Sequence, residues 1–315
     1  MKLTAKAFAP GAISSFFEIH NTTPDDKPIT DLERIGARGG GFGLQSGVHT
    51  KVTLEEAAVN SLQVFINLQS TVEAKTTENV IQTMLNQTGK NYMVKVEHQI
   101  DVPIGMGFGT SAGGALTTGL ALREALALPL TYNQIGKIAH IAEIQCQTGF
   151  GTVSSLTVGG GLILVTEPGA PGICQIDRIP ISPDYVIVAG FCSSKIPKNV
   201  LSSPERKVQI NRYGKKALKQ ILADPTLENF LASCWGFAQK AGFATEKIHQ
   251  LVNLAKKAGA VGATQNMIGE AVHAVVLEEK AFSVAEAFKQ VLPIEQIITT
   301  KIDFQGARLV RHEKV

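Results

Sequence analysis

The sequence lacks a strong excess of charge of either sign, and this narrows the possible partners. Asp, Glu, Lys and Arg make up 18% of the 315 residues, and the formal net charge is only +3. A protein that binds nucleic acid usually carries a concentrated basic patch, so we expect no nucleic-acid partner. The length favours two domains, and the 44% of hydrophobic residues is typical of a globular protein with a substantial core.

Cysteine and histidine are also scarce, and they do not recur at the spacings of metal or redox sites. The four cysteines form no Cys-x-x-Cys motif, and the seven histidines form no His-Glu-x-x-His motif. We therefore expect reduced, mostly buried thiols and no structural metal. The sequence has no signal-peptide hydrophobic region and no apolar run long enough to span a membrane, which predicts a cytoplasmic protein without membrane contact.

The most informative stretch that is present is a glycine-rich segment at residues 102–115. The segment before it, residues 92–102, alternates apolar and polar residues as a half-buried strand does. The segment after it, residues 115–128, is rich in Ala and Leu and has helical composition. The chain is thus predicted to run from strand through glycine loop to helix.

The residues of this loop favour phosphate binding. Gly105, Gly107 and Gly109 lack a side chain, which lets backbone N–H groups approach an anion closely. Thr110 and Ser111 stand where we expect a helix N-cap, and a helix N-terminus supplies free N–H donors and a positive dipole end. The two hydroxyls are then placed to reach a metal ion or a phosphate oxygen.

Other interpretations of the glycine loop fit less well. A P-loop requires Gly-x4-Gly-Lys-Ser/Thr, and this loop has no lysine. A dinucleotide fingerprint requires Gly-x-Gly-x-x-Gly and an acidic residue about 20 positions later, whereas Pro129 and Leu130 stand there. A purely structural glycine turn remains open, although glycines and hydroxyls converging on one helix start favour the phosphate site.

Two further segments carry candidate site residues. Residues 36–43 are rich in glycine and form either a flexible hairpin tip or a ligand-facing loop that presents Arg38, which would bind an anionic substrate. Residues 131–147 have helical spacing, with His140 and Glu143 beside the apolar face. A carboxylate there is unfavourable unless it is paired, so Glu143 meets either a specific cation or simply lysine or solvent.

The remaining elements predict an α+β sandwich. A strand at residues 3–9 should end in a turn at residues 9–11. Further strands are expected near residues 47–54, 63–68, 156–165, 185–190, 271–276 and 294–303, and further helices near residues 71–87, 204–223, 227–241, 245–258 and 283–291.

These motifs resemble those of the GHMP kinases, the superfamily of galactokinase, homoserine kinase, mevalonate kinase and phosphomevalonate kinase. Residues 103–112 resemble its Pro-x3-Gly-Leu-Gly-Ser-Ser-Ala motif, residues 9–11 its N-terminal motif, and Glu143 its magnesium-binding glutamate. Residues 259–269 stand where its third glycine motif belongs but read Gly-Ala-Thr-Gln-Asn-Met-Ile-Gly at their end. Together with residues 36–52, this variant resembles the archaeal pantoate kinase branch.

The resemblance implies a fold and a reaction. The fold would comprise a ribosomal protein S5 domain 2-like N-terminal domain, residues 1–175, and a ferredoxin-like C-terminal domain, residues 176–315, with the active site between them. The reaction would be ATP- and Mg²⁺-dependent phosphorylation of the 4-hydroxyl of (R)-pantoate to 4-phosphopantoate, in archaeal coenzyme A biosynthesis. A homodimer is implied as well.

The resemblance also implies roles for individual residues. Ser111 and Glu143 would present hard oxygens to Mg²⁺, and Arg38 would bind the pantoate carboxylate. His140, one turn before Glu143, would either contact the substrate, which we favour, or orient the glutamate. The ATP-binding residues would be Pro103, Gly105, Gly107, Gly109, Thr110, Ser111, Ala112 and Gly113.

One position departs from the family pattern. Many members carry an aspartate after the helix that bears the glutamate, and the nearest match here is Thr152, which cannot act as a general base near neutral pH. Either the substrate hydroxyl loses its proton late, to the phosphoryl group itself, or another residue serves; Thr152 would then only hydrogen-bond the reacting hydroxyl. Two other functions stay open: a kinase of homoserine, mevalonate or shikimate, and a nucleotide-binding protein without catalysis.

Overall fold

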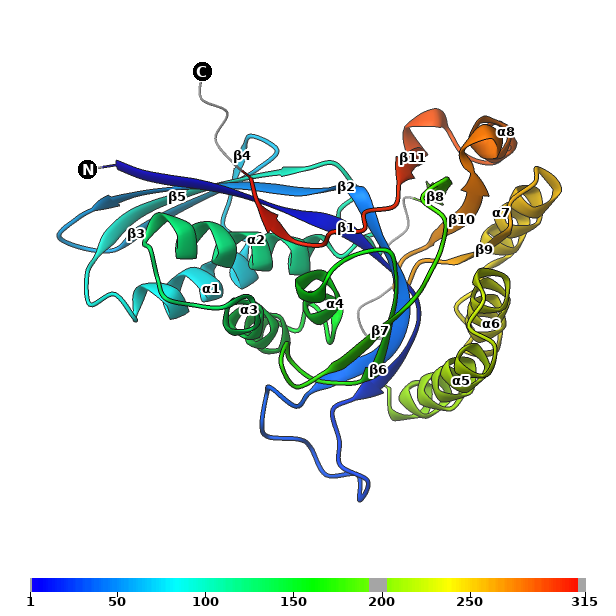
Figure 1. Ribbon diagram of the computed structural model, residues 1–315, viewed down its shortest axis with the longest axis horizontal. Coiled ribbons are helices and arrows are strands. Elements are labelled where there is room, and N and C mark those ends of the chain that lie inside the picture. The colour runs from blue at the N-terminus through cyan, green and yellow to red at the C-terminus, as the bar shows by residue number, and fades with distance from the viewer. Residues whose placement is uncertain (1, 193–202, 311–315) are drawn as a thin grey trace.

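Two β-sheets organise the fold, one built mostly from the first half of the chain and one from the second (Figure 1). The structure is a computed structural model that describes residues 2–192 and 203–310. The first sheet has the order β12-β1-β2-β5-β3-β4, with β6 also paired to β2 and β7 paired to β6. Its strands are β1 (Lys2–His20), β2 (Gly36–Glu56), β3 (Ser61–Ile66), β4 (Gln69–Thr71), β5 (Tyr92–Ile100), β6 (Leu162–Glu167), β7 (Gln175–Ile179) and β12 (Arg308–Leu309).

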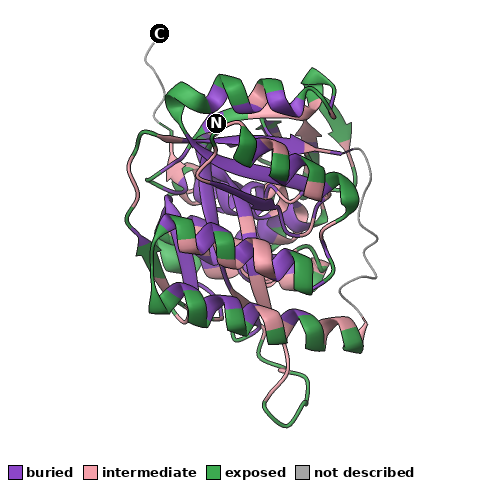
Figure 2. Cartoon of the chain, turned by 90° about the vertical axis from the view of Figure 1, so that its right-hand side faces the viewer, coloured by how far each residue is buried: buried purple, intermediate pink, exposed green. Residues whose placement is uncertain are grey.

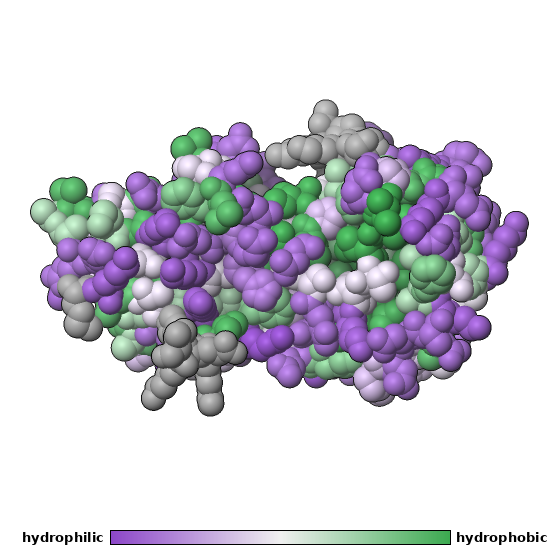
Figure 3. Space-filling view, turned by 90° about the horizontal axis from the view of Figure 1, so that it is seen from above, coloured by the Kyte–Doolittle hydropathy of each residue, from purple (hydrophilic) through white to green (hydrophobic). Residues whose placement is uncertain are grey.

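Four helices cover one face of this sheet (Figure 1). They are α1 (Lys75–Leu85), α2 (Thr110–Ala125), α3 (Tyr132–Cys146) and α4 (Thr152–Val158). Strand β5 alternates buried and more exposed residues, which confirms the predicted half-buried strand. Figure 3, seen from above, shows many hydrophilic side chains over the opposite face of the sheet.

The first strand does not end where we predicted a turn. Strand β1 continues through residues 9–11 and is paired with β2 along most of its length, with a register shift between Pro10 and Gly11. Proline has no N–H to donate, and a bulge is one of the few places in a sheet that accept it. The Pro-Gly pair therefore marks an irregularity within a long strand.

The glycine-rich residues 36–43 are neither a hairpin tip nor a loop, as we had expected, but the first part of strand β2. Gly39, Gly40 and Gly41 pair with β1 on one side and with β6 on the other. A methyl group added to Gly41 would lie 1.7 Å from the carbonyl oxygen of Ile13, so this approach of two backbones requires glycine. The predicted strand at residues 156–165 is likewise split, because α4 extends to Val158 before β6 begins.

The second sheet is antiparallel and has the order β11-β8-β10-β9. In chain order this is 4-1-3-2, the arrangement of a ferredoxin-like domain, as the family resemblance implies. Its strands are β8 (Tyr185–Phe191), β9 (Gly262–Gln265), β10 (Ala271–Leu277) and β11 (Ile297–Lys301).

Helices of the second half have the bounds that their capping residues favour. The longer helices are α5 (Pro204–Ala223), α6 (Leu227–Lys240) and α7 (Glu246–Lys257), and α8 (Ala281–Phe288) follows β10 after a short 3₁₀ turn. Ser203, Thr226 and Thr245 precede α5, α6 and α7, and the side chain of each accepts a hydrogen bond from an N–H of the first turn. Figure 2, which views the molecule from this side, shows exposed residues on the outer surface of the helices and buried residues behind them.

The division of the chain at residue 175 stays a proposal. Strand β7 belongs to the first sheet and ends at Ile179, whereas the second sheet begins at Tyr185. Strand β12, close to the C-terminus, returns to pair with β1. Across the described ranges, no helix combines the length and the apolar character needed to cross a lipid bilayer.

Candidate active site

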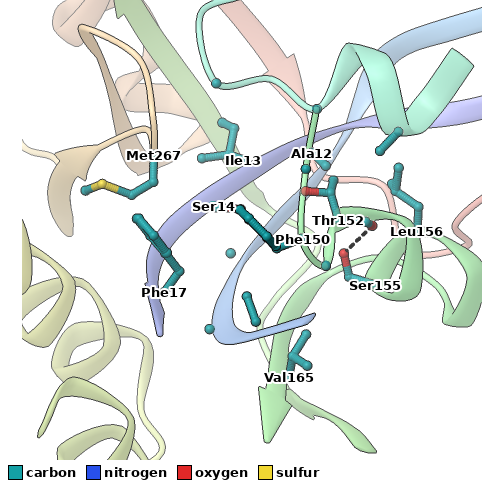
Figure 4. A pocket seen from close by; sticks show the side chains of 18 of the residues that line it. Ala12, Ile13, Ser14, Phe17, Phe150, Thr152, Ser155, Leu156, Val165 and Met267 are labelled. Atoms are coloured by element: carbon teal, nitrogen blue, oxygen red, sulfur yellow. Dashed lines mark hydrogen bonds between the residues drawn. The ribbon is translucent and has the colours of Figure 1, made fainter. Parts of the chain in front are cut away.

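A cavity of about 340 Å³ lies where the glycine loop, strands β1 and β2, and the segment from α3 to α4 come together. Figure 4 shows Phe17 and Met267 on one side of it and Thr152 and Leu156 on the other. Most of the site residues expected from the sequence line this cavity. They are Arg38, Gly105, Gly107, Gly109, Thr110, Ser111, Ala112, Glu143 and Thr152.

Three expected residues do not line the cavity: Pro103, Gly113 and His140. A methyl group added to Gly113 would lie 2.9 Å from Cγ2 of Val48, so this glycine permits close packing of α2 on the sheet. His140 is only 1% exposed, and its Nε2 lies 2.9 Å from the carbonyl oxygen of Ile35. Burial lowers the pKa of His140, which favours the neutral ring. Helical spacing placed His140 one turn before Glu143, but it did not specify which way the ring points.

The glycine loop ends in a helix start that no side chain caps. Gly105, Gly107 and Gly109 all have φ between 64° and 79°. The N-cap of α2 is Gly109, one residue before the hydroxyls that we expected there, and no side chain accepts a hydrogen bond from the first turn. In contrast, Thr131 caps α3 through its hydroxyl. The N–H groups at the start of α2 are therefore available to an anion such as a phosphate.

Glu143 is a buried carboxylate beside this helix start. The residue is 2% exposed, and its Oε1 accepts a hydrogen bond of 3.0 Å from Oγ1 of Thr148. Burial raises the pKa of Glu143, although hydrogen bonds from Ser111 and Thr148 oppose this rise. Within the described part of the chain, no lysine, arginine or histidine forms an ion pair with Glu143.

These oxygens fit a magnesium ion. Mg²⁺ is commonly held by one or two protein oxygens, with phosphate oxygens and waters completing its shell. The Glu143 carboxylate and the Ser111 hydroxyl both line the cavity next to the uncapped start of α2. The space is limited, because a methyl group added to Gly149 would lie 2.5 Å from Oε2 of Glu143. A buried carboxylate without a cation is unfavourable, and a bound divalent ion would remove that cost.

Arg38 is the one cationic residue among the described residues that line the cavity. Its Nη2 lies 2.9 Å from Oε2 of Glu167, and its Nη1 lies 3.7 Å from Oε2 of Glu18. Burial by itself would lower the pKa of Arg38, but the hydrogen bond with Glu167 and the charges of both glutamates raise it. Its Nε is buried and has no hydrogen-bond partner in the described chain.

Thr152 begins helix α4 beside the glycine loop. A methyl group added to Gly109 would lie 3.0 Å from Cγ2 of Thr152, which shows how closely the two segments approach. The only carboxylate among the described lining residues is Glu143. No second acid therefore stands in this part of the cavity to replace the aspartate that many family members carry.

Sequence reasoning did not identify the apolar part of the cavity wall. Ile13, Phe17, Phe150, Val165 and Met267 contribute to it (Figure 4). They come from segments far apart in the chain, so no local pattern could have grouped them. The sequence did indicate one of these residues, because the predicted third motif at residues 259–269 includes Met267.

This third motif lies against strand β1 and the glycine loop. The N–H of Met267 donates a hydrogen bond of 2.7 Å to the carbonyl of Ser14 in β1. A methyl group added to Gly107 would lie 3.1 Å from Cβ of Asn266, so the glycine loop packs tightly on the same segment. The glycine loop and the third motif thus meet at the cavity, beside strand β1.

Comparisons with known proteins agree with this arrangement. The family described as GHMP kinases N terminal domain matches residues 75–160. The chain is 32% identical to a pantoate kinase of Methanocaldococcus jannaschii over 86% of its own length and 93% of that protein. It is 28% identical to a pantoate kinase of Thermococcus kodakarensis, with 91% of each chain covered.

A solved structure described as "Phosphotransferase related to CoA biosynthesis pathway" also superposes on the chain. The TM-score is 0.87 at 26% identity, with 98% of this chain and 99% of that chain covered. The similarity therefore spans both sheets and the cavity between them.

Proposed function

This chain belongs to the pantoate kinase family of the GHMP kinases, and we propose that its cavity transfers the γ-phosphoryl group of ATP to the 4-hydroxyl of (R)-pantoate. The observation that carries this proposal is that half-buried Ser111 and buried Glu143 both line the cavity at an uncapped helix start. Phosphoryl transfer depends mostly on positioning and on neutralising phosphate charge, and this pair and the loop N–H groups supply both.

We assign the nucleotide phosphates to the glycine loop. The N–H groups at the start of α2 would hold the phosphate oxygens, and Gly105, Gly107 and Gly109 keep the backbone accessible. Ser111 and Glu143 would hold Mg²⁺, which neutralises charge on the transferred group. Pro103 and Gly113 would shape the loop and the helix packing without contacting ATP.

The acid substrate would be held by Arg38 and the apolar wall. Pantoate carries one carboxylate and two methyl groups on the same carbon. Arg38 offers a guanidinium for the carboxylate, and side chains such as Ile13, Phe17 and Met267 offer an apolar surface for the methyl groups. Homoserine fits less well, because its ammonium group needs an acceptor and it has no methyl groups to bury.

We propose that no protein group removes the substrate proton before transfer. Thr152 would accept or donate a hydrogen bond to the reacting hydroxyl, and the proton would leave late, to the transferred phosphoryl group. A loose transition state tolerates this order because the nucleophile is only weakly bonded. For His140 we now propose a positioning role, since its hydrogen bond to Ile35 ties α3 to the start of β2.

Turnover with a panel of acids tests this function. The purified protein is incubated with ATP, Mg²⁺ and pantoate, homoserine, mevalonate or shikimate, and release of ADP is measured. We expect ADP with pantoate. Release with another acid but not with pantoate would contradict the substrate assignment, and ATP binding without turnover on any acid would favour a non-catalytic nucleotide-binding protein.

Replacing Arg38 tests the substrate-binding role. Arg38→Ala should raise the KM for pantoate about 10-fold or more and leave the KM for ATP nearly unchanged, because a charged hydrogen bond contributes about 1.5–3 kcal/mol. Equal effects on both constants would indicate a structural role for Arg38.

We also propose a homodimer, which the resemblance to archaeal pantoate kinases implies. Light scattering during size-exclusion chromatography should give about twice the chain mass of 33.6 kDa. A mass of one chain would contradict this.

A further inference from the structure

Two threonine hydroxyls connect the proposed metal ligands, one from Thr148, which lines the cavity, and one from Thr76, which does not. Thr76, in the first turn of α1, is 6% exposed, and its Oγ1 lies 3.4 Å from Oγ of Ser111. The same Oγ1 lies 3.2 Å from Oγ1 of Thr148, which in turn lies 3.0 Å from Oε1 of Glu143. A row of oxygen atoms therefore leads from Ser111 through Thr76 and Thr148 to Glu143.

When Glu143 is ionised, the donors and acceptors available fix which hydroxyl donates to which along this row. A carboxylate only accepts hydrogen bonds, so Thr148 donates its single proton to Glu143. Thr148 must then accept from Thr76, and Thr76 must accept from Ser111. The direction is thus from Ser111 toward Glu143.

A bound metal ion makes this direction necessary. A neutral hydroxyl binds a cation through an oxygen lone pair, so its proton has to point away from the ion. In the structure the Ser111 hydroxyl already donates to Oγ1 of Thr76, at 3.4 Å, so its proton points along this row. If Ser111 and Glu143 hold Mg²⁺, the Ser111 hydroxyl would keep Thr76 as its acceptor and leave its lone pairs to the ion.

We propose that Thr76 is a positioning residue: it accepts a hydrogen bond from the Ser111 hydroxyl, which keeps the Ser111 lone pairs available to the metal, and through Thr148 it fixes the two ligands relative to each other. This inference rests on the proposed function. Groups that orient metal ligands through hydrogen bonds typically contribute 10- to 100-fold to metal affinity. Thr76 itself does not line the cavity and contacts neither nucleotide nor substrate in this scheme.

The neighbouring residue provides a matched control. Thr77 lies in the same helical turn and is 5% exposed. Its Oγ1 lies 3.1 Å from Nε2 of His98, so it also makes one buried hydrogen bond, but on a path away from the metal ligands. Thr77→Val therefore removes a comparable hydroxyl and leaves the hydrogen bonds from Ser111 to Glu143 intact.

The experiment measures Mn²⁺ affinity in the presence of ADP by electron paramagnetic resonance, with folding checked by circular dichroism. We expect Thr76→Val to weaken Mn²⁺ binding about 10-fold. Thr76→Ser should restore most of the affinity, and Thr77→Val should stay within about twofold of wild type. In a Ser111→Ala background, Thr76→Val should cause a clearly smaller loss, because only its path through Thr148 to Glu143 remains.

Three results would overturn the inference: unchanged affinity in Thr76→Val, an equal loss in Thr77→Val, or the same additional loss in the Ser111→Ala background. Mn²⁺ binding to the wild-type protein distinguishes a failure of this inference from a failure of the proposed function. If ADP does not promote Mn²⁺ binding to wild type, the magnesium site itself is wrong, and both proposals fall.

Discussion

At the scale of single residues, the buried Glu143 carboxylate should lower the stability of the metal-free protein. Its carboxylate is buried and has hydrogen bonds but no cation within the described chain. Its pKa is raised from 4.5, so the folded state holds the proton more tightly than the unfolded state does. The stability of the metal-free protein therefore falls as pH rises from about 4.5 toward the raised pKa.

Glu143→Gln should remove this cost. The amide keeps an oxygen that accepts from Thr148 but carries no charge. We expect the free energy of unfolding at pH 7 without metal to increase by about 1 kcal/mol or more. Calorimetry at pH 5 and pH 7 measures this, and the gain should shrink at pH 5.

The same variant should lose metal-dependent turnover, because the ion loses its anionic ligand. A Glu143→Gln protein that is less stable than wild type without metal, yet turns over normally, would contradict the role we assign to Glu143.

A second prediction at the residue scale concerns Gly149, which lies beside the Glu143 carboxylate. A methyl group at this position would lie 2.5 Å from Oε2 of Glu143, so Gly149→Ala should push the carboxylate out of place. We expect metal affinity, measured by Mn²⁺ titration with ADP, to fall about 10-fold or more while the far-ultraviolet circular dichroism stays that of wild type. Unchanged affinity would mean that the carboxylate can move without consequence.

At the scale of elements, strand β2 depends on its glycines because two neighbouring strands approach it closely. Gly41→Ala would bring a methyl group within 1.7 Å of the Ile13 carbonyl oxygen, so the strands would have to separate. We expect a loss of about 3 kcal/mol or more, as for other overpacked interior positions. Urea unfolding measures the change.

Gly236 in α6 is the matched control for this substitution. A methyl group there meets no atom within 4 Å, and alanine favours a helix over glycine by about 0.8–1.0 kcal/mol. Gly236→Ala should therefore stabilise the protein. Similar effects of the two substitutions would refute the argument from close strand packing.

At the scale of the whole molecule, two buried histidines link elements that are distant in sequence. His98 bonds Thr50 and Thr77, which joins the first sheet to α1. His273 bonds Ser15 at 2.9 Å and Asn266 at 2.7 Å, which joins the second sheet to β1. Burial lowers the pKa of His98 to about 4 and that of His273 to about 3.

These shifts predict destabilisation in mild acid. Both folded-state pKa values lie below the ordinary value of 6.5, so the unfolded chain binds more protons as pH falls below 6.5. Each histidine should lower the stability by about 1.5 kcal/mol between pH 6.5 and pH 5. Glu143 contributes with the opposite sign, so the comparison has to be made between variants.

Urea unfolding of wild type and His273→Gln at several pH values isolates one histidine. The variant should be less stable at pH 7, but its stability should fall less steeply toward pH 5. Parallel curves for the two proteins would show that His273 does not titrate on unfolding in this range.

The sequence by itself determined the features that depend on neighbouring residues. The glycine loop, the helix after it and the position of Glu143 on its helix followed from spacing, whereas the ferredoxin-like half and the family followed from the resemblance of the motifs to the GHMP kinases. These inferences succeeded because backbone conformation and helix periodicity are set by residues within a few positions of one another.

Only the tertiary structure decided the features that depend on contacts between distant segments. It placed residues 36–43 in a strand, because β1 and β6 approach them from both sides. It turned His140 toward Ile35, and it grouped Thr76 with Ser111 and Thr148. A residue's spacing along the chain predicts which face of an element it occupies. The atoms that meet that face belong to other segments, and their positions are set by the packing of the whole chain.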